Sequence, residues 1–136
     1  MKKLFWIAAI AVVLSASALL SCSPGFIEPE ALEEPAYVFM SLVSEGEAYR
    51  CDDADVVATL AEGYNSLQLA EAPEGVTAET STLLRIDFYD ATHALLGTYS
   101  IDRTGVCHYG GYDGPMFPIE GGIDYDYALE VYESLK

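Results

Sequence analysis

The segment LRIDFYD alternates apolar and polar side chains, and this alternation constrains the fold more than any other feature of the chain. Leu84, Ile86 and Phe88 are apolar, whereas Arg85 and Asp87 between them are charged. A period of two residues is that of a β-strand, whose side chains point alternately to opposite faces of a sheet. The chain therefore needs a sheet with one face buried against a core and the other face in contact with water.

Two more strands are expected directly after this one. Ala94 to Ile101 and Val106 to Tyr109 carry apolar and aromatic residues, and short turns at Asp90–His93 and Asp102–Gly105 precede them. Connections of this length join antiparallel neighbours, because a parallel crossover needs a dozen or more residues. The sequence therefore predicts an antiparallel meander.

Further strands are expected on both sides of the meander. Tyr37 to Val43 and Ala48 to Cys51 have strand-like composition, and a Gly- and Pro-rich loop after the meander has room for a short edge strand from Met116 to Ile119. Residues Ala70 to Ser81 are polar and contain a proline and a glycine, so a loop is expected there.

Two segments have the apolar spacing of helices. One follows Asp52 and Asp53, either of which can cap the first N–H groups, and the other follows Asp124. Gly63 either ends the first helix or lies in a weak continuation toward Leu69. The predicted fold is α+β: an antiparallel β-meander sheet with one or two helices packed on one face.

The first 22 residues have the pattern of a secretory signal. Lys2 and Lys3 precede an uncharged apolar stretch, which ends in Leu19-Leu20-Ser21-Cys22. This ending resembles the lipobox of bacterial lipoprotein precursors. The resemblance implies that residues 1–21 are a signal peptide, that it is removed, and that Cys22 carries acyl chains as the first residue of the mature protein. An uncleaved membrane helix is the alternative, since about 20 apolar residues suffice to span a bilayer.

The lipobox also implies a location and a domain organisation. The protein is expected to be lipid-anchored on the extracytoplasmic face of the cell membrane, or in the outer membrane if the host has two membranes. Residues 22–35 form an acidic, Pro-rich stretch, which is expected to be an extended tether that lifts the domain some 40 Å from the membrane. Residues 36–136 are expected to form one small globular domain. Its part from Leu83 to Leu135 weakly resembles small lipoprotein domains of unassigned activity.

The charge of the chain limits the partners it can have. The formal net charge is −16, and removing residues 1–21 takes away two of the six basic residues and none of the 22 acidic ones, which leaves −18. Such a domain repels nucleic acid and anionic lipid head groups, so neither is an expected partner. Phosphate-binding and dinucleotide-binding motifs are absent from the sequence, and no cofactor is expected.

Two cysteines remain after lipidation of the first. Outside the cytoplasm, Cys51 and Cys107 are expected to form a disulfide, and closing so long a loop would stabilise the fold by about 4 kcal/mol. Cys107 and His108 do not form a convincing metal site, because adjacent strand residues point to opposite faces. No metal site is therefore predicted.

Tyrosines are the residues most suggestive of binding. Of the ten tyrosines, Tyr109, Tyr112, Tyr125 and Tyr127 flank the Gly-rich loop, and tyrosine offers a rigid apolar ring with a polar tip. With no catalytic set in the sequence, the predicted function is a non-enzymatic binding module tethered to the membrane, with an envelope protein or a glycan as partner. The alternatives are a structural envelope lipoprotein without a specific ligand, and a thiol-redox or hydrolytic enzyme that uses Cys51 and Cys107.

Overall fold

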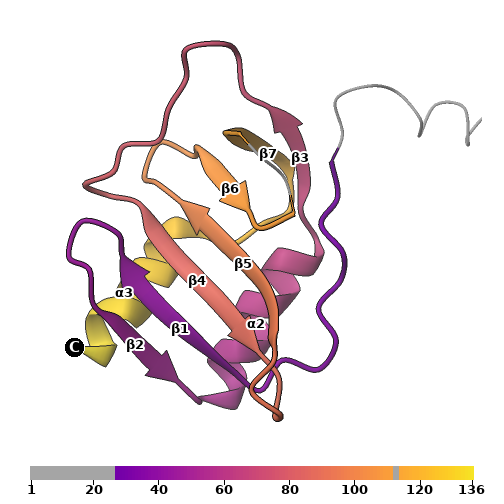
Figure 1. The fold of residues 1–136 in the computed structure, drawn as a ribbon, viewed down its shortest axis with the longest axis vertical. Coiled ribbons are helices and arrows are strands. Elements are labelled where there is room, and N and C mark those ends of the chain that lie inside the picture. The colour runs from indigo at the N-terminus through magenta and orange to yellow at the C-terminus, as the bar shows by residue number, and fades with distance from the viewer. Residues whose placement is uncertain (1–26, 112–113) are drawn as a thin grey trace, which may run out of the picture.

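The computed structural model describes residues 27–111 and 114–136 of the chain. The predicted signal peptide, the lipidation residue Cys22 and the predicted binding residue Tyr112 lie outside the described residues. The described part forms one sheet with two helices beside it (Figure 1).

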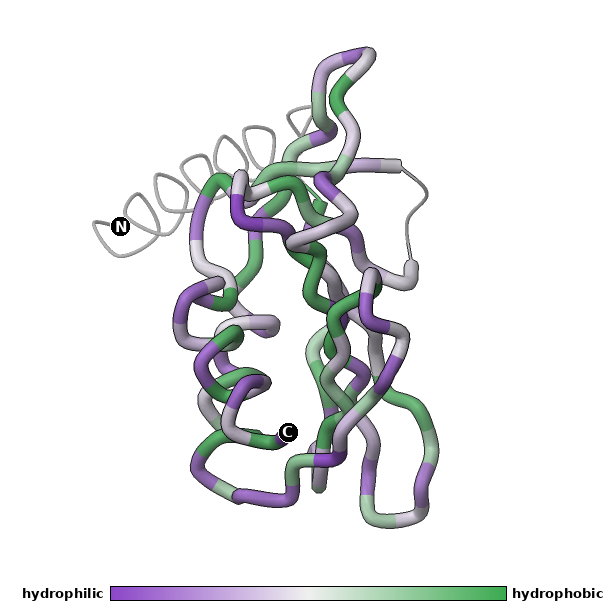
Figure 2. Tube along the Cα trace, turned by 90° about the vertical axis from the view of Figure 1, so that its left-hand side faces the viewer, coloured by the Kyte–Doolittle hydropathy of each residue, from purple (hydrophilic) through white to green (hydrophobic). Residues whose placement is uncertain are grey.

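The sheet has seven strands, all paired antiparallel, in the order β2-β1-β4-β5-β6-β7-β3. The two helices lie on the same face of this sheet, and Figure 2 shows the helical layer beside the layer of strands. This confirms the predicted α+β class. The elements are β1 (Tyr37–Leu42), β2 (Ala48–Cys51), α2 (Ala54–Asn65), β3 (Gln68–Glu71), β4 (Leu84–Tyr89), β5 (Leu95–Ile101), β6 (Cys107–Tyr109), β7 (Met116–Glu120) and α3 (Tyr125–Leu135).

The core lies between the sheet and the helices, and the alternating strand β4 sets its position. Ile86 and Phe88 are fully buried, and they lie opposite Met40 and Val38 of the neighbouring strand β1. From the other side of the core, α2 and α3 contribute large side chains that include Tyr64 and Tyr132. Burial of one strand face against two amphipathic helices removes a contiguous set of apolar side chains from water, which is the main favourable term in folding.

The face of the sheet that the helices leave uncovered carries its own small aromatic cluster. Tyr37 stacks on Tyr89 with ring centroids 5.2 Å apart, and Phe39 meets both rings edge-on. The guanidinium of Arg50 lies 3.8 Å above the ring of Tyr37. Tyr37 is therefore buried although it points away from the helices, which the alternation pattern alone does not predict.

Helix α2 begins where the sequence predicts, and it continues through Gly63. The carboxylate of Asp53 accepts hydrogen bonds from the backbone N–H groups of Asp55 and Val56, at 3.0 and 3.3 Å. A glycine inside a helix costs about 1 kcal/mol relative to alanine. Here it permits a close approach, because a Cβ at position 63 would lie 2.8 Å from the carbonyl oxygen of Gly122.

Strand β3 lies partly where a loop was expected. Gln68–Glu71 overlaps the start of the predicted loop from Ala70 to Ser81, and it pairs antiparallel with β7. As a result β7 is an interior strand and β3 is the edge strand. The pairing joins segments far apart in the sequence and includes an irregular register between Gln68 and Leu69. No local sequence pattern therefore predicts this strand.

Residues 27–36, which we call the strap, are docked on the domain. Ile27 and Leu69 exchange two backbone hydrogen bonds of 2.7 and 2.8 Å, which cover the edge strand β3 at one point. Further along, the N–H of Leu32 donates to the side chain of Asn65 at 2.8 Å, and the Leu32 side chain is only 8% exposed. The predicted tether therefore does not extend freely as far as residue 35. Leu32 is buried and Ile27 half-buried, although prolines and glutamates dominate the composition of the segment.

Two hairpin turns of the meander use the same five-residue design. In the β4–β5 turn, Oδ1 of Asp90 accepts from the N–H and the hydroxyl of Thr92 and from the N–H of Ala94. In the β5–β6 turn, Oδ1 of Asp102 accepts from the N–H and the hydroxyl of Thr104 and from the N–H of Val106. The fourth residue of each turn has a positive φ angle, which is 70° in His93 and 97° in Gly105.

Asp102 differs from its counterpart because it is fully buried and holds a second segment. Its Oδ2 accepts from the N–H of Glu79 at 2.7 Å, which ties the long loop before β4 to the β5–β6 turn. Burial alone would raise the pKa of Asp102, but the hydrogen bonds from Glu79, Thr104 and Val106 outweigh it and hold this pKa below its ordinary value.

Replacing Asp102 with alanine is expected to lower the free energy of unfolding by about 3 kcal/mol, because several donors lose a charged, buried acceptor. A lowered folded-state pKa means that Asp102 stabilises the fold at neutral pH. This contribution is present above the ordinary carboxyl pKa and disappears as the pH falls through the lower folded-state value. Chemical denaturation at neutral and acidic pH measures both effects.

Asp90→Ala is the matched control for this experiment, because it removes the same turn contacts at a half-buried site. It is expected to cost less stability than Asp102→Ala. Equal losses for the two variants would contradict the role assigned to burial and to the contact with Glu79.

Candidate functional site

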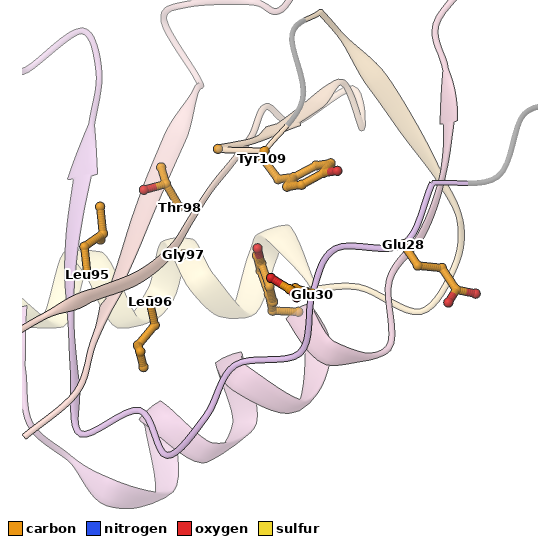
Figure 3. A pocket seen from close by; sticks show the side chains of 10 residues that line it. Glu28, Glu30, Leu95, Leu96, Gly97, Thr98 and Tyr109 are labelled. Atoms are coloured by element: carbon orange, nitrogen blue, oxygen red, sulfur yellow. The ribbon is translucent and has the colours of Figure 1, made fainter.

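A cleft of about 510 Å³ lies between the strap on one side and strands β5 and β6 on the other. Figure 3 shows its residues. Glu28 and Glu30 come from the strap, Leu96 and Gly97 from β5, and Tyr109 from β6. Tyr64 of α2 also lines the cleft. The strap, helix α2 and the β5–β6 hairpin, which are distant from one another in the sequence, therefore meet at one depression in the surface.

Gly97 makes this arrangement possible. A Cβ at position 97 would lie 3.0 Å from Cδ2 of Leu32 and 3.0 Å from the hydroxyl oxygen of Tyr64. Such a distance is shorter than ordinary van der Waals contact between carbon atoms. The bare backbone of β5 thus receives a side chain of the strap and a side chain of α2 at the same place, and of the two Tyr64 lines the cleft.

The position of the Tyr109 ring depends on the glycines that follow β6. A Cβ at position 111 would lie 2.7 Å from Cε2 of Tyr109, so the ring occupies the space that a side chain would need. The N–H of Gly110 donates to the carbonyl oxygen of Thr98 at 3.0 Å and keeps this segment next to β5. Figure 3 shows the Tyr109 ring extending from β6 toward the strap residues Glu28 and Glu30.

The electrostatic environment of the cleft is negative. Burial raises the pKa of Tyr64, and the neighbouring Tyr109 and Glu30 raise it further. Among the described residues, no lysine or arginine forms an ion pair with Glu28 or Glu30. A cleft with carboxylates at its rim and with tyrosine rings and a leucine inside can hold a group that combines positive charge with apolar surface.

The structure does not bring the predicted binding tyrosines onto one surface. Tyr109 lines the cleft described above, whereas Tyr127 lines a separate cleft of about 450 Å³ beside α2 and the start of α3. Tyr125 donates its hydroxyl to the carbonyl oxygen of Thr82 at 2.6 Å, which holds α3 to the loop before β4. Tyr112 lies outside the described residues.

The sequence interpretation gave no binding role to Glu28, Glu30 or Tyr64 of the cleft. Both glutamates lie in the segment that was expected to be an extended tether. The apolar residues Ile27 and Leu32 are the signal that could have indicated docking of this segment, because the bridge from Ile27 to Leu69 and the burial of Leu32 hold the glutamates beside β5.

The structure does not contain the predicted disulfide. Cys51 and Cys107 are both free and buried. They lie on β2 and β6, which three strands separate. Four strand spacings amount to about 19 Å, whereas the Cα atoms of a disulfide lie within about 7 Å of each other. Sequence spacing carries no information on this separation.

The environment of Cys107 does not favour nucleophilic chemistry. Its thiol donates to the carbonyl oxygen of Met116 at 3.4 Å in the core. Burial raises its pKa to about 11, with a further contribution from the nearby Asp102. Because the thiolate is the reactive form, a thiol of this kind reacts slowly at neutral pH.

The two histidines do not adjoin these thiols in a catalytic arrangement. Nδ1 of His93 lies 2.7 Å from the hydroxyl oxygen of Tyr37 on the uncovered face of the sheet. His108 lies opposite Ser100 on β5. Within residues 27–111 and 114–136, no group of three or more histidine, cysteine, aspartate or glutamate side chains is placed to hold a metal ion.

Comparison of the chain with protein-family models, with curated proteins and with solved structures finds no match. Neither helix of the described part is both long and apolar enough to cross a membrane. What the cleft can bind must therefore be inferred from its own residues.

Without reductant, Cys51 and Cys107 are expected to react slowly with a thiol reagent in the native protein and completely after unfolding in guanidinium. A soluble form that begins at residue 22 and carries Cys22→Ser permits this measurement. Because the folded-state pKa of Cys107 is raised, its protonated thiol favours folding below the ordinary thiol pKa of about 9, and this contribution is lost as the pH rises toward about 11. Failure to detect two thiols after unfolding would contradict the free state of both cysteines.

Proposed function

We propose that this protein is a lipid-anchored extracytoplasmic binding module without enzymatic activity, and that its cleft binds a positively charged, partly apolar segment of an envelope protein. The observation that carries the binding site is the combination of Tyr109 and Leu96 with the carboxylates of Glu28 and Glu30 in one cleft. The lipobox ending at Cys22 supports the anchor and the location.

The charge of the protein supports a basic partner. The formal charge of residues 22–136 is −18, and the described basic residues are already engaged with carboxylates elsewhere. A lysine or arginine of a partner would meet Glu30 at the cleft, and its aliphatic stem would lie along Tyr109 and Leu96. Long-range attraction would also accelerate the encounter at low salt.

The buried cysteines favour binding over catalysis. A redox or hydrolytic role would need an accessible thiol of low pKa, whereas Cys51 and Cys107 are enclosed in the core and the pKa of Cys107 is raised. Tyrosine, leucine and carboxylate side chains provide recognition without a nucleophile.

The proposal is tested with short peptides that contain lysine or arginine next to aliphatic or aromatic residues, compared with peptides in which glutamine replaces the basic residue. The cationic peptides are expected to bind, and binding should weaken as salt increases. Tyr109→Ala and Glu30→Gln should each weaken binding by about tenfold, which is typical of losing one well-placed contact. Isothermal titration calorimetry measures these affinities.

Two further variants make the test specific. Tyr127→Ala removes a half-buried tyrosine from the other cleft and should leave peptide affinity unchanged. Gly111→Ala keeps Tyr109 but places a methyl group where its ring lies, and it should weaken binding without unfolding the domain. A glycan array run in parallel detects sugar recognition by the same cleft. Equal binding of cationic and neutral peptides, or insensitivity to Tyr109→Ala, would overturn the proposal.

A further inference from the structure

The hydroxyl group of Tyr64 is a polar group that the fold encloses beside the cleft. We infer that this hydroxyl determines the specificity of the cleft, because it accepts a hydrogen bond from a cation that carries N–H groups, such as an ammonium or a guanidinium, and disfavours quaternary ammonium groups. The inference rests on the proposed function, and it goes beyond it by assigning the residue that recognises the cation and the chemical form of that cation.

The first step is the position of this hydroxyl. Tyr64 is only 4% exposed, yet it is one of the residues that line the cleft. Its hydroxyl oxygen lies beside the backbone of Gly97, 3.0 Å from where a Cβ atom at that position would be, and Gly97 lines the same cleft. The polar end of this tyrosine is therefore the part that meets the cleft, whereas its ring lies in the core.

The second step is the state of this hydroxyl in the absence of a ligand. Within residues 27–111 and 114–136, the hydroxyl of Tyr64 has no hydrogen-bond partner. In contrast, the hydroxyl of Tyr132, the other large buried tyrosine of the helical layer, donates to the carboxylate of Glu45 at 2.6 Å. An enclosed hydroxyl without a partner lowers the stability of a fold. A hydroxyl of this kind at a cleft indicates that its partner is part of the ligand.

The third step is the part of Tyr64 that a ligand can use. Its ring packs against Phe88 with ring centroids 5.4 Å apart, and it meets the ring of Tyr99 at nearly a right angle, with centroids 6.2 Å apart. The ring is thus engaged in the core, and the oxygen is left for the ligand. Quaternary ammonium groups bind to the faces of aromatic rings and have no N–H group to offer to an oxygen. A cation with N–H donors fits this arrangement better.

The charge near the hydroxyl explains why its expected partner is a cation. Burial raises the pKa of Tyr64, and Tyr109 and Glu30 raise it further, so the phenol stays protonated at neutral pH. Glu30 is thus close enough to act on this hydroxyl. Ammonium and guanidinium groups carry several N–H donors. One such cation can donate to the carboxylate of Glu30 and to the hydroxyl oxygen of Tyr64 at the same time.

The test compares two peptides on the full-length protein in a non-ionic detergent, with calorimetry as the measurement. One is a peptide with blocked ends and a single lysine between leucines, and the other carries trimethyl-lysine, which keeps the charge and the aliphatic stem but has no N–H donors. The native protein should bind the lysine peptide about tenfold more tightly. Tyr64→Phe should weaken binding of the lysine peptide by about tenfold and leave that of the trimethyl-lysine peptide nearly unchanged.

Thermal unfolding distinguishes recognition from a structural role. Tyr64→Phe removes one oxygen and keeps the ring, so the melting temperature should stay the same or rise, because the lost hydroxyl had no partner in the fold. Tyr99→Phe is the matched control. Tyr99 is a neighbouring, fully buried tyrosine whose hydroxyl lies in the core near the thiol of Cys107, and it does not line the cleft. This control should leave the affinities for both peptides unchanged.

The outcomes separate this inference from the proposed function. If the native protein binds the lysine peptide and Tyr64→Phe binds it equally well, the role of the hydroxyl is wrong and the proposed function stands. Equal or tighter binding of the trimethyl-lysine peptide by the native protein, or a lower melting temperature of Tyr64→Phe, also contradicts the inference. If the native protein binds neither peptide, the proposed function fails and the inference with it. Loss of affinity for the lysine peptide alone, at unchanged or higher stability, supports the inference.

Discussion

The contact that Leu32 and Tyr64 make with the backbone of Gly97 is the constraint on which the rest of the arrangement depends. It joins the strap, helix α2 and strand β5 at a point where no side chain fits on the strand. Because the strap is held there, Glu28 and Glu30 stay beside β5 and the cleft has two walls instead of one. The fold of the sheet and the composition of the binding site are thus linked through the absence of one Cβ atom.

The two aspartate turns show that the same local hydrogen-bonding pattern contributes differently to stability in different surroundings. Asp90 and Asp102 organise their hairpins with the same hydrogen bonds, and both lie between strands of the meander. Only Asp102 is removed from water and accepts a further bond from Glu79. Burial thus makes a turn residue a link between two segments, because a buried carboxylate is stable only when its acceptor positions are filled.

Much of the fold could be predicted from the sequence, because most of its elements have local signals. The alternation from Leu84 to Phe88 identified β4, and the Asp52-Asp53 pair predicted the start of α2, where the structure shows Asp53 as the cap. Strand β3 was largely missed, since its pairing with β7 depends on distant residues and an irregular register.

The candidate site was less predictable than the fold. Of the residues in the cleft, Tyr109 was expected to bind, but its neighbours come from a segment whose composition indicates a tether. The separation of Cys51 from Cys107 likewise follows from the order of the strands, which no sequence pattern specifies. Both depend on tertiary proximity, whereas residue patterns report mainly on local structure.

The single bridge between Ile27 and Leu69 also has a consequence for self-association. Strand β3 is the edge of the sheet, and the strap covers it at only that one point. Proteolysis within the strap would also expose the backbone N–H and C=O groups of Leu69, and an edge without any cover is a template for pairing with another chain. The first residues of the domain therefore protect its solubility as well as shape its cleft, and a recombinant fragment that starts at β1 would lack that protection.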